Sequence, residues 1–194
     1  VSASVMLPDS MRIQPQLATA EGTATVALSP DGSLLAFAGS HGTRSRLFTR
    51  PLSQFAVRAL DGTEGAQAPF FSPSGEAIYF FAAEGVKRIV LADGRVTLVR
   101  PPPVGTFDGE AWGGTAMPDG TIVLSQRLAS ELLVLSPTGD SIRTVACRSI
   151  CAFPAAMSDG RHVLATSGDF LLLIDIETGE ARRVTRRSAS GEDE

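Results

Sequence analysis

One phrase occurs four times along this 194-residue chain: an apolar run, a turn built mostly from Ser, Pro, Asp and Gly, and a second apolar run. Asp31, Ser74, Asp119 and Asp159 occupy the same slot of the turn, so successive copies are 43, 45 and 40 residues apart. A repeat of this length is typical of an array of similar supersecondary units. Each unit then buries its apolar faces against its neighbours.

The turns predict tight connections between antiparallel strands. In the first turn, Pro30 presets a φ near −65°, Asp31 can accept a hydrogen bond from the following backbone, and Gly32 supplies a left-handed residue. This geometry explains the recurring carboxylates without a metal series, so we predict neither a metal nor a cofactor. The later copies place the same chemistry at Pro73, Gly75, Asp119, Gly120, Asp159 and Gly160.

Each repeat contains apolar runs that predict the central strands of a four-stranded antiparallel sheet. The runs are nearly continuous, as in residues 78–83 and 170–174, which indicates strands covered on both faces. A parallel α/β sheet would need crossover helices of ten or more residues, and no such pattern is visible. We therefore predict an all-β fold, a β-propeller with four recognisable blades. The strands that follow the first are predicted at 34–38, 45–49 and 56–60; 77–82, 85–91 and 96–100; 121–125, 131–135 and 141–146; and 162–166, 170–176 and 181–185.

The repeat also predicts boundaries along the chain. Residues 1–20 form a lead-in strand or extension, residues 21–187 form the blades, and the acidic tail 188–194 is expected to be disordered. Four blades could close a ring with help from residues 1–20, or they could be the front portion of a longer propeller. We favour the second interpretation, which predicts self-association through an open apolar blade face. The blades are expected at 21–63, 64–107, 108–148 and 149–187.

The composition of the chain indicates which classes of partner it is not expected to bind. The net charge is −4 and 20% of the residues are charged, without a basic stripe, so we expect no nucleic-acid binding. No run of 18 apolar residues and no signal peptide are visible, so we expect no membrane span in this chain. Cys147 and Cys151 could be two free thiols or a loop disulfide, and these alternatives are evenly balanced. A metal site is much less favoured because neither His41 nor His162 lies near them in sequence.

Two resemblances narrow the class further. Residues 29–37 match the repeat of TolB-like bacterial propellers, and residues 72–75, 119–120 and 159–160 keep parts of it. A tighter similarity concerns the propeller that follows the kinase domain and membrane helix of many bacterial receptor-type serine/threonine protein kinases. The strings that carry it are residues 7–13, 47–52 and 60–73. This resemblance implies an extracytoplasmic sensor or protein-interaction module, although the chain contains no kinase motif.

Catalytic constellations are not visible, so we predict that this chain is not an enzyme. Neither His lies in a nucleophile motif, and the two Cys have no His or Lys nearby to lower a thiol pKa. A binding surface is instead expected on the rim that carries the interblade connections and the turns between second and third strands. The candidate residues on this rim are His41, Arg44, Glu64, Phe107, Asp108, Glu110, Trp112, Arg127 and Arg148.

Trp112 has two possible roles. It lies in the predicted loop 101–114 and could anchor a partner, or it could plug the space between blades 2 and 3. For the whole chain, three functions stay open: a kinase-associated sensor propeller, a TolB-like periplasmic protein-binding propeller, and the propeller of a prolyl-oligopeptidase-like hydrolase whose catalytic domain lies elsewhere. A ligand or protein partner is therefore expected, but its identity is not encoded in any motif.

Overall fold

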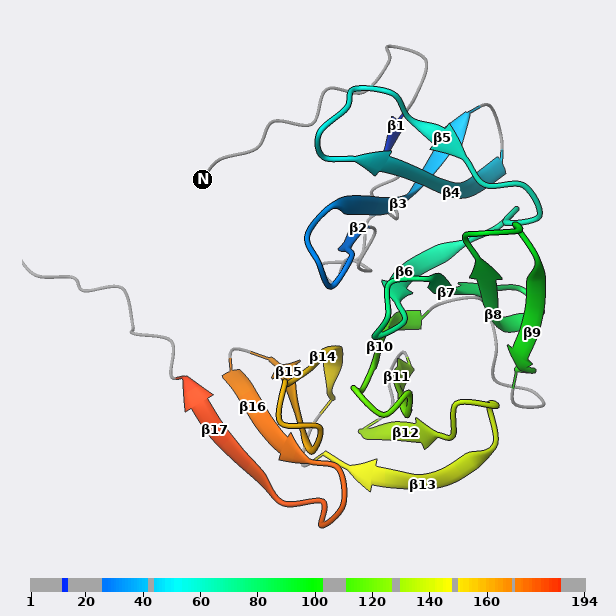
Figure 1. The fold of residues 1–194 in the computed structure, drawn as a ribbon. Coiled ribbons are helices and arrows are strands. Elements are labelled where there is room, and N and C mark those ends of the chain that lie inside the picture. Colours follow the sequence, from blue (N-terminus) through cyan, green and yellow to red (C-terminus); the bar gives the residue numbers. More distant parts are fainter. Residues whose placement is uncertain are drawn as a thin grey trace, which may run out of the picture.

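The computed structural model describes residues 12–13, 26–41, 44–102, 111–126, 130–147, 150–168 and 170–185. All regular elements within these ranges are β-strands, and they form four antiparallel sheets. Figure 1 shows the sheets following one another around a common axis, with the first strand of each repeat innermost and the last at the periphery. The fold is a β-propeller of four blades, which confirms the predicted all-β class.

Blades 2 to 4 are simple four-stranded meanders, whereas blade 1 has five strands, of which the first two both pair with the third. Blade 1 contains β1 (Arg12–Ile13), β2 (Val26–Leu28), β3 (Leu34–His41), β4 (Arg44–Pro51) and β5 (Arg58–Ala59). Blade 2 contains β6 (Gln67–Phe71), β7 (Ala77–Ala82), β8 (Gly85–Val90) and β9 (Val96–Arg100). Blade 3 contains β10 (Ala111–Ala116), β11 (Ile122–Gln126), β12 (Glu131–Leu135) and β13 (Ser141–Ala146). Blade 4 contains β14 (Ala152–Ala156), β15 (His162–Ser167), β16 (Phe170–Asp175) and β17 (Ala181–Thr185).

The first two strands of each repeat are joined as the turn chemistry predicts. In blade 1, Gly32 N donates to the Ser29 carbonyl oxygen at 2.8 Å, and Leu34 N donates to Ser29 Oγ at 2.9 Å. The Asp31 carboxylate accepts hydrogen bonds from the Ser29 and Ser33 hydroxyls and from Ser33 N. The carboxylate of Asp31 therefore accepts its hydrogen bonds from polar groups of its own turn.

The blades hold together because apolar side chains of each sheet pack against the facing sheet of a neighbouring blade. We call the face toward the next blade along the chain the forward face, and the opposite one the back face. Alternate residues of a strand point to opposite faces, so one apolar run supplies two interblade cores. The core between blades 1 and 2 contains Ala36, Ala38 and Leu47 against Ile78, Phe80 and Ile89. The next contains Tyr79, Phe81 and Val86 against Ile122, Leu124 and Leu135; the last contains Val123, Leu132 and Val134 against Val163, Ala165, Leu172 and Ile174.

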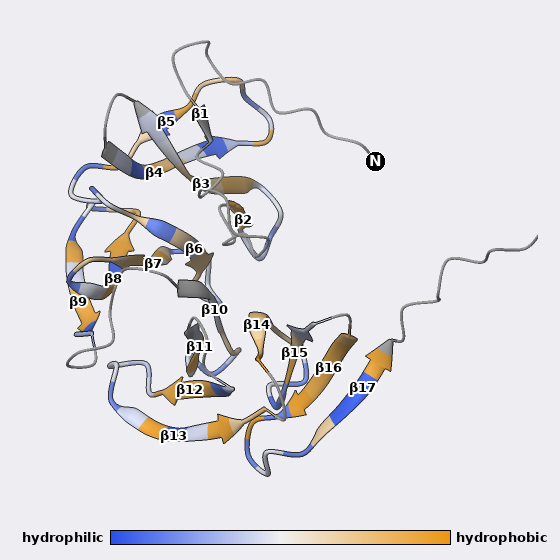
Figure 2. Cartoon of the chain, turned by 180° about the vertical axis from the view of Figure 1, so that it is seen from behind, coloured by the Kyte–Doolittle hydropathy of each residue, from blue (hydrophilic) through white to orange (hydrophobic). Residues whose placement is uncertain are grey.

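The peripheral strands are more polar, in keeping with their position. Four of the first five residues of β13 are exposed, and Figure 2 shows hydrophilic stretches along β13 and β17. The outermost strand of blade 1 is shorter than expected: β5 covers only two residues, Arg58 and Ala59. Figures 1 and 2 place blades 1 and 4 at the two ends of the arc, so that the back face of blade 1 and the forward face of blade 4 lie against no other blade of the described chain.

The turn between the third and fourth strands of blade 3 meets the outer strand of blade 2 closely. A Cβ added to Gly139, whose φ is +94°, would overlap the carbonyl oxygen of Val99 in β9. The corresponding Gly94 of blade 2 has a φ of +70° but meets no atom within 4 Å. Both glycines therefore have a left-handed backbone conformation, but only Gly139 lacks the space for a Cβ atom.

We expect Gly139→Ala to lower the free energy of unfolding by about 3 kcal/mol, because it adds a steric overlap to the cost of a left-handed alanine. Gly94→Ala is the matched control and should cost about 1 kcal/mol. Urea unfolding of both variants measures the difference. Equal losses would show that the interblade approach at Val99 contributes nothing.

Candidate functional site

The sheets present two rims, and the candidate site lies on one of them. The turn rim carries the Ser/Pro/Asp/Gly turns. The interblade rim carries the connections between blades and the turns between second and third strands. His41 and Arg44 are paired across the ends of β3 and β4 at the interblade rim. Glu64 lies in the connection from β5 to β6, on the same rim.

The remaining predicted rim residues are placed only in part. Arg127 directly follows β11, which ends at the interblade rim with Gln126. Phe107, Asp108, Glu110, Arg127 and Arg148 lie outside the described residues, and so do the side chains of His41, Arg44 and Trp112. Their convergence on one surface therefore stays a prediction.

The prediction that residues 101–114 form one connecting loop is wrong at its end. Residues 111–116 form β10, the innermost strand of blade 3, so Trp112 lies in a strand. Of the two glycines that follow Trp112, Gly114 serves close packing. A Cβ at Gly114 would lie 2.5 Å from Phe70 Cε1 of blade 2.

Sequence reasoning missed an irregularity that recurs at this end of three blades. The pairing of the innermost strand shifts register in β6, β10 and β14, at the interblade-rim end of each strand. The shift coincides with a positive φ at Ala68 (44°), Gly113 (137°) and Phe153 (52°). Bulges and left-handed residues that are not glycine are concentrated at binding and active sites. The available signal was Pro69 and Pro154, since a proline inside a strand marks a bulge.

Two buried polar atoms lie at the same end of the blades. Gln67 Oε1 and Ser125 Oγ have no hydrogen-bond partner among the described residues, and Ser125 is fully buried. Gln67 precedes the bulge at Ala68, and Ser125 pairs with Gly113 at the bulge of β10. Buried polar groups are almost always paired, so each exception requires an explanation.

Ion pairs and a disulfide order the connections of this rim. The Arg46 guanidinium lies 3.4 Å from the Glu64 carboxylate and 3.9 Å from the Asp61 carboxylate; Arg46 is half-buried and the two acidic residues are exposed. Cys147 and Cys151 form a disulfide within the connection between blades 3 and 4. Of the two alternatives from the sequence, the structure therefore contains the bridge. Among the described residues, no group of three His, Cys, Asp or Glu side chains is placed to hold a metal.

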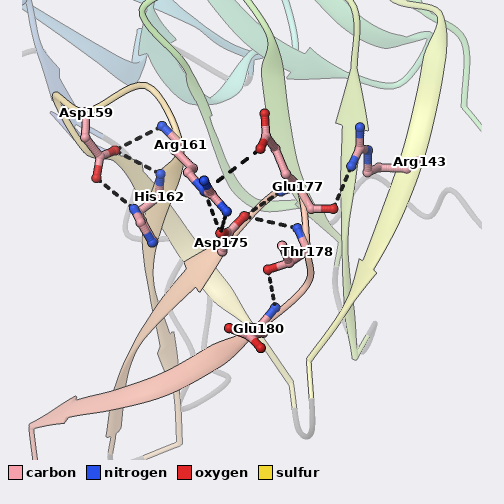
Figure 3. A network of polar contacts seen from close by, with 8 residues as sticks. All are labelled: Arg143, Asp159, Arg161, His162, Asp175, Glu177, Thr178 and Glu180. Atoms are coloured by element: carbon pink, nitrogen blue, oxygen red, sulfur yellow. Dashed lines mark hydrogen bonds and ion pairs between the residues drawn. The ribbon is translucent and has the colours of Figure 1, made fainter.

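A second polar cluster lies on blade 4, toward the turn rim (Figure 3). Asp175 accepts hydrogen bonds from Glu177 N at 2.8 Å and Thr178 N at 3.0 Å, and from the Arg161 guanidinium at 2.6 Å. Burial alone would raise the pKa of Asp175, but these hydrogen bonds outweigh it and lower the pKa to about 2. The Asp175 carboxylate is thus a structural anchor of the β16–β17 turn.

A cavity of about 560 Å³ adjoins this cluster. Its polar side chains include His162, Asp175 and Thr178. His162 Nδ1 lies 2.7 Å from Asp159, a residue of its own turn. The cavity is lined by Ala146, His162, Leu173, Asp175, Thr178, Gly179, Glu180, Ala181 and Arg182.

Fold and sites define the class of protein: a β-propeller without a visible catalytic constellation among the described residues. No family model matches the sequence, and no curated protein matches it either. Solved structures do match. TolB from Acinetobacter baumannii is 19% identical with a TM-score of 0.64, and the match covers 81% of this chain and 41% of that chain. The β-propeller domain of Cps50 (Swd1) from Myceliophteria thermophila is 15% identical with a TM-score of 0.63, covering 87% and 57%.

The fold similarity extends to an enzyme. A gluconolactonase from Xanthomonas campestris is 12% identical with a TM-score of 0.63, and the match covers 79% of this chain and 56% of that chain. At these identities the comparisons establish the propeller fold and no activity. The chain spans only about two fifths to three fifths of the length of these proteins. None of the residues that the structure describes forms a helix of the length and apolarity that crossing a bilayer requires.

The turn carboxylates predict how stability depends on pH. Hydrogen bonds from the Ser29 and Ser33 hydroxyls lower the pKa of Asp31 from 3.8 to about 2. The His162 and Arg161 backbone amides, followed by the His162 ring, lower the pKa of Asp159 to about 2. A carboxylate with a lowered pKa in the folded state stabilises the fold above its unfolded pKa and loses that contribution as pH falls through the folded pKa.

We therefore expect the contribution of these turn carboxylates to the free energy of unfolding to be complete above about pH 5 and to be lost between about pH 4 and pH 2. Urea unfolding across this range measures the slope, which Asp31→Asn should reduce. Asp61→Asn is the control, because the Asp61 side chain is fully exposed and should leave the slope unchanged. A slope that is identical in wild type and Asp31→Asn would contradict the role of the turn carboxylate.

The disulfide predicts a second measurable property. Since the bridge closes a loop of only a few residues, its removal in Cys147→Ser/Cys151→Ser should lower the free energy of unfolding by about 2 kcal/mol. Mass spectrometry after alkylation without reductant should find no modified cysteine in protein purified from an oxidising compartment. Two alkylated cysteines in that protein would contradict the bridge.

Proposed function

We propose that this chain is a non-catalytic β-propeller that binds protein partners through its interblade rim. The observation that carries the proposal is the recurring bulge at this rim in blades 2, 3 and 4, together with the unpaired buried atoms of Gln67 and Ser125. Strained backbone persists where surrounding structure and function require it. Because the bulge recurs at the same rim in three blades, it supports a shared recognition surface rather than an isolated irregularity.

The residues that would contact the partner are those predicted from the sequence. Arg and Trp are favoured anchors of protein interfaces, and loops on a rigid scaffold present them. Glu64 is ordered by Arg46 and half exposed, so it is available at the rim. We propose the surface His41, Arg44, Glu64, Phe107, Asp108, Glu110, Trp112, Arg127 and Arg148.

We further propose that the module lies outside the cytoplasmic membrane and senses a ligand for a receptor-type serine/threonine kinase. The sequence strings at residues 7–13, 47–52 and 60–73 support this assignment by resemblance. The Cys147–Cys151 disulfide also supports it, because disulfides persist in oxidising compartments. A TolB-like periplasmic binding protein is the second candidate, favoured by the turn motif at residues 29–37.

The complete reading frame separates these candidates. An upstream kinase with a hydrophobic stretch of about 20 residues would support the sensor. An upstream signal peptide would support the TolB-like protein. A downstream domain with a Gly-x-Ser-x-Gly motif would instead support the third candidate, the propeller of a prolyl-oligopeptidase-like hydrolase.

Site-specific photo-crosslinking tests the binding rim. A photoreactive amino acid at Glu64, in the cell that makes the full-length protein, should give a crosslink to a discrete protein. The matched control places it at Asp93, a somewhat more exposed carboxylate in the β8–β9 turn on the turn rim, and should give none. Crosslinks from Asp93 alone would overturn the assignment of the rim.

A further inference from the structure

The back face of blade 1 differs from the other three back faces at one position. Directly opposite Leu35, the third strand of blade 1 carries Arg50. The same slot, opposite the equivalent second-strand residue, holds Ile89 in blade 2, Leu135 in blade 3 and Ile174 in blade 4. Those three aliphatic side chains are buried in interblade cores. Only the blade without a preceding blade in the described chain places a cation there.

The Arg50 guanidinium is buried but incompletely paired. Arg50 is only 4% exposed, and its Nε donates a 2.8 Å hydrogen bond to the Gln54 carbonyl oxygen. Nη1 is buried without a hydrogen-bond partner, and no ion pair to a carboxylate is recorded among the described residues. A buried charge without a counter-charge is costly, and aliphatic residues of similar volume are usually at least as stable in its place. Folding alone therefore does not explain Arg50.

Exposed apolar side chains surround this cation. Phe55 stacks on the guanidinium, with its ring centre 5.3 Å from Cζ, yet it is 78% exposed. Leu28 lies opposite Leu35 in the same row of the sheet and is 51% exposed; Leu52, held by its backbone to Ser33, is 39% exposed. Large exposed apolar side chains around a buried arginine form the pattern of an interface anchor with an apolar surround.

We propose that Arg50 anchors a second protein-binding site on the back face of blade 1, beside the buried pair Phe37 and Phe48. Its guanidinium pairs with an Asp or Glu carboxylate of a partner protein, while apolar side chains next to that residue pack on Leu28, Leu52 and Phe55. Movement of the Phe55 ring off the guanidinium admits the carboxylate to Nη1. The inference rests on the proposed function as a protein-binding propeller, but it concerns a different face from the interblade rim.

The proposal predicts that Arg50 serves binding and not folding. Arg50→Leu restores the aliphatic residue of the other three blades, so its melting temperature should equal that of wild type or exceed it by roughly 2–4 °C. Arg58→Leu removes an exposed arginine of the same blade and should leave the melting temperature unchanged. A clearly lower melting temperature for Arg50→Leu would show that Arg50 stabilises the fold and would overturn the proposal.

Selection of random 12-residue peptides on the purified chain tests recognition. We expect enriched peptides to carry an Asp or Glu beside aromatic or aliphatic residues. Arg50→Leu should weaken their binding at least tenfold, Phe55→Ala several-fold, and Arg58→Leu less than twofold. A peptide whose Asp or Glu is replaced by Asn or Gln should bind wild type more weakly than the original peptide does. This amide peptide should bind Arg50→Leu as tightly as it binds wild type.

Three results would overturn the inference: no enriched peptide, peptides without an acidic residue, or peptides that bind Arg50→Leu as tightly as wild type. Self-association that disappears in Arg50→Leu, measured by sedimentation, would also overturn it by making a second copy the occupant. Peptides that bind independently of Arg50, together with a crosslink from Glu64, would leave the interblade-rim function intact. Absence of the Glu64 crosslink alone would contradict partner binding at the interblade rim and would not bear on the Arg50 site.

Discussion

Burial of both faces of every inner sheet is the interaction on which this structure depends. Blades 2 and 3 pack against a neighbouring blade on both faces, so their central strands are mostly apolar, with Lys87 and Arg88 of β8 as half-buried exceptions. Ile78 and Phe80 of β7 enter one core while Tyr79 and Phe81 enter the next. A one-residue slip of such a strand exchanges the two sets of side chains between cores. The register of each blade is therefore determined by both neighbours at once.

This requirement explains what the sequence could reveal. The four turns and the continuous apolar runs identify a propeller and its strands, because period and turn chemistry are local properties. The alignment of the turn Asp residues is less informative about register. Met117 N pairs with the Thr121 carbonyl, whereas Ser72 N pairs with that of Ala77, so the third turn is one residue shorter. Ile122, and not Val123, consequently takes the place of Ile78 in the sheet.

Features that depend on neighbouring blades were not predictable in the same way. Gly113 and Gly114 suggest a loop when they are considered alone, but the need for space beside Phe70 arises only when blade 2 packs against blade 3. The bulges at Ala68 and Phe153 are similarly hidden, although the prolines that follow them give a local signal. Arg50 belongs to the same group: it looks like an ordinary strand residue until its slot is compared with Ile89, Leu135 and Ile174.

The two ends of the arc solve the problem of an unpartnered sheet in different ways. On blade 4 the forward face keeps Leu164 and Leu173 only half-buried and places the His162 and Asp175 pair at one edge of the same face. This face retains the apolar centre of an interblade surface, and self-association through it stays a prediction. On blade 1 the back face instead carries Arg50 in the slot of a core aliphatic residue, and its guanidinium is already buried without a carboxylate partner among the described residues. The two ends are thus not interchangeable. Self-association through an apolar blade face stays a prediction for the forward face of blade 4, whereas for the back face of blade 1 we propose a partner that brings its own carboxylate.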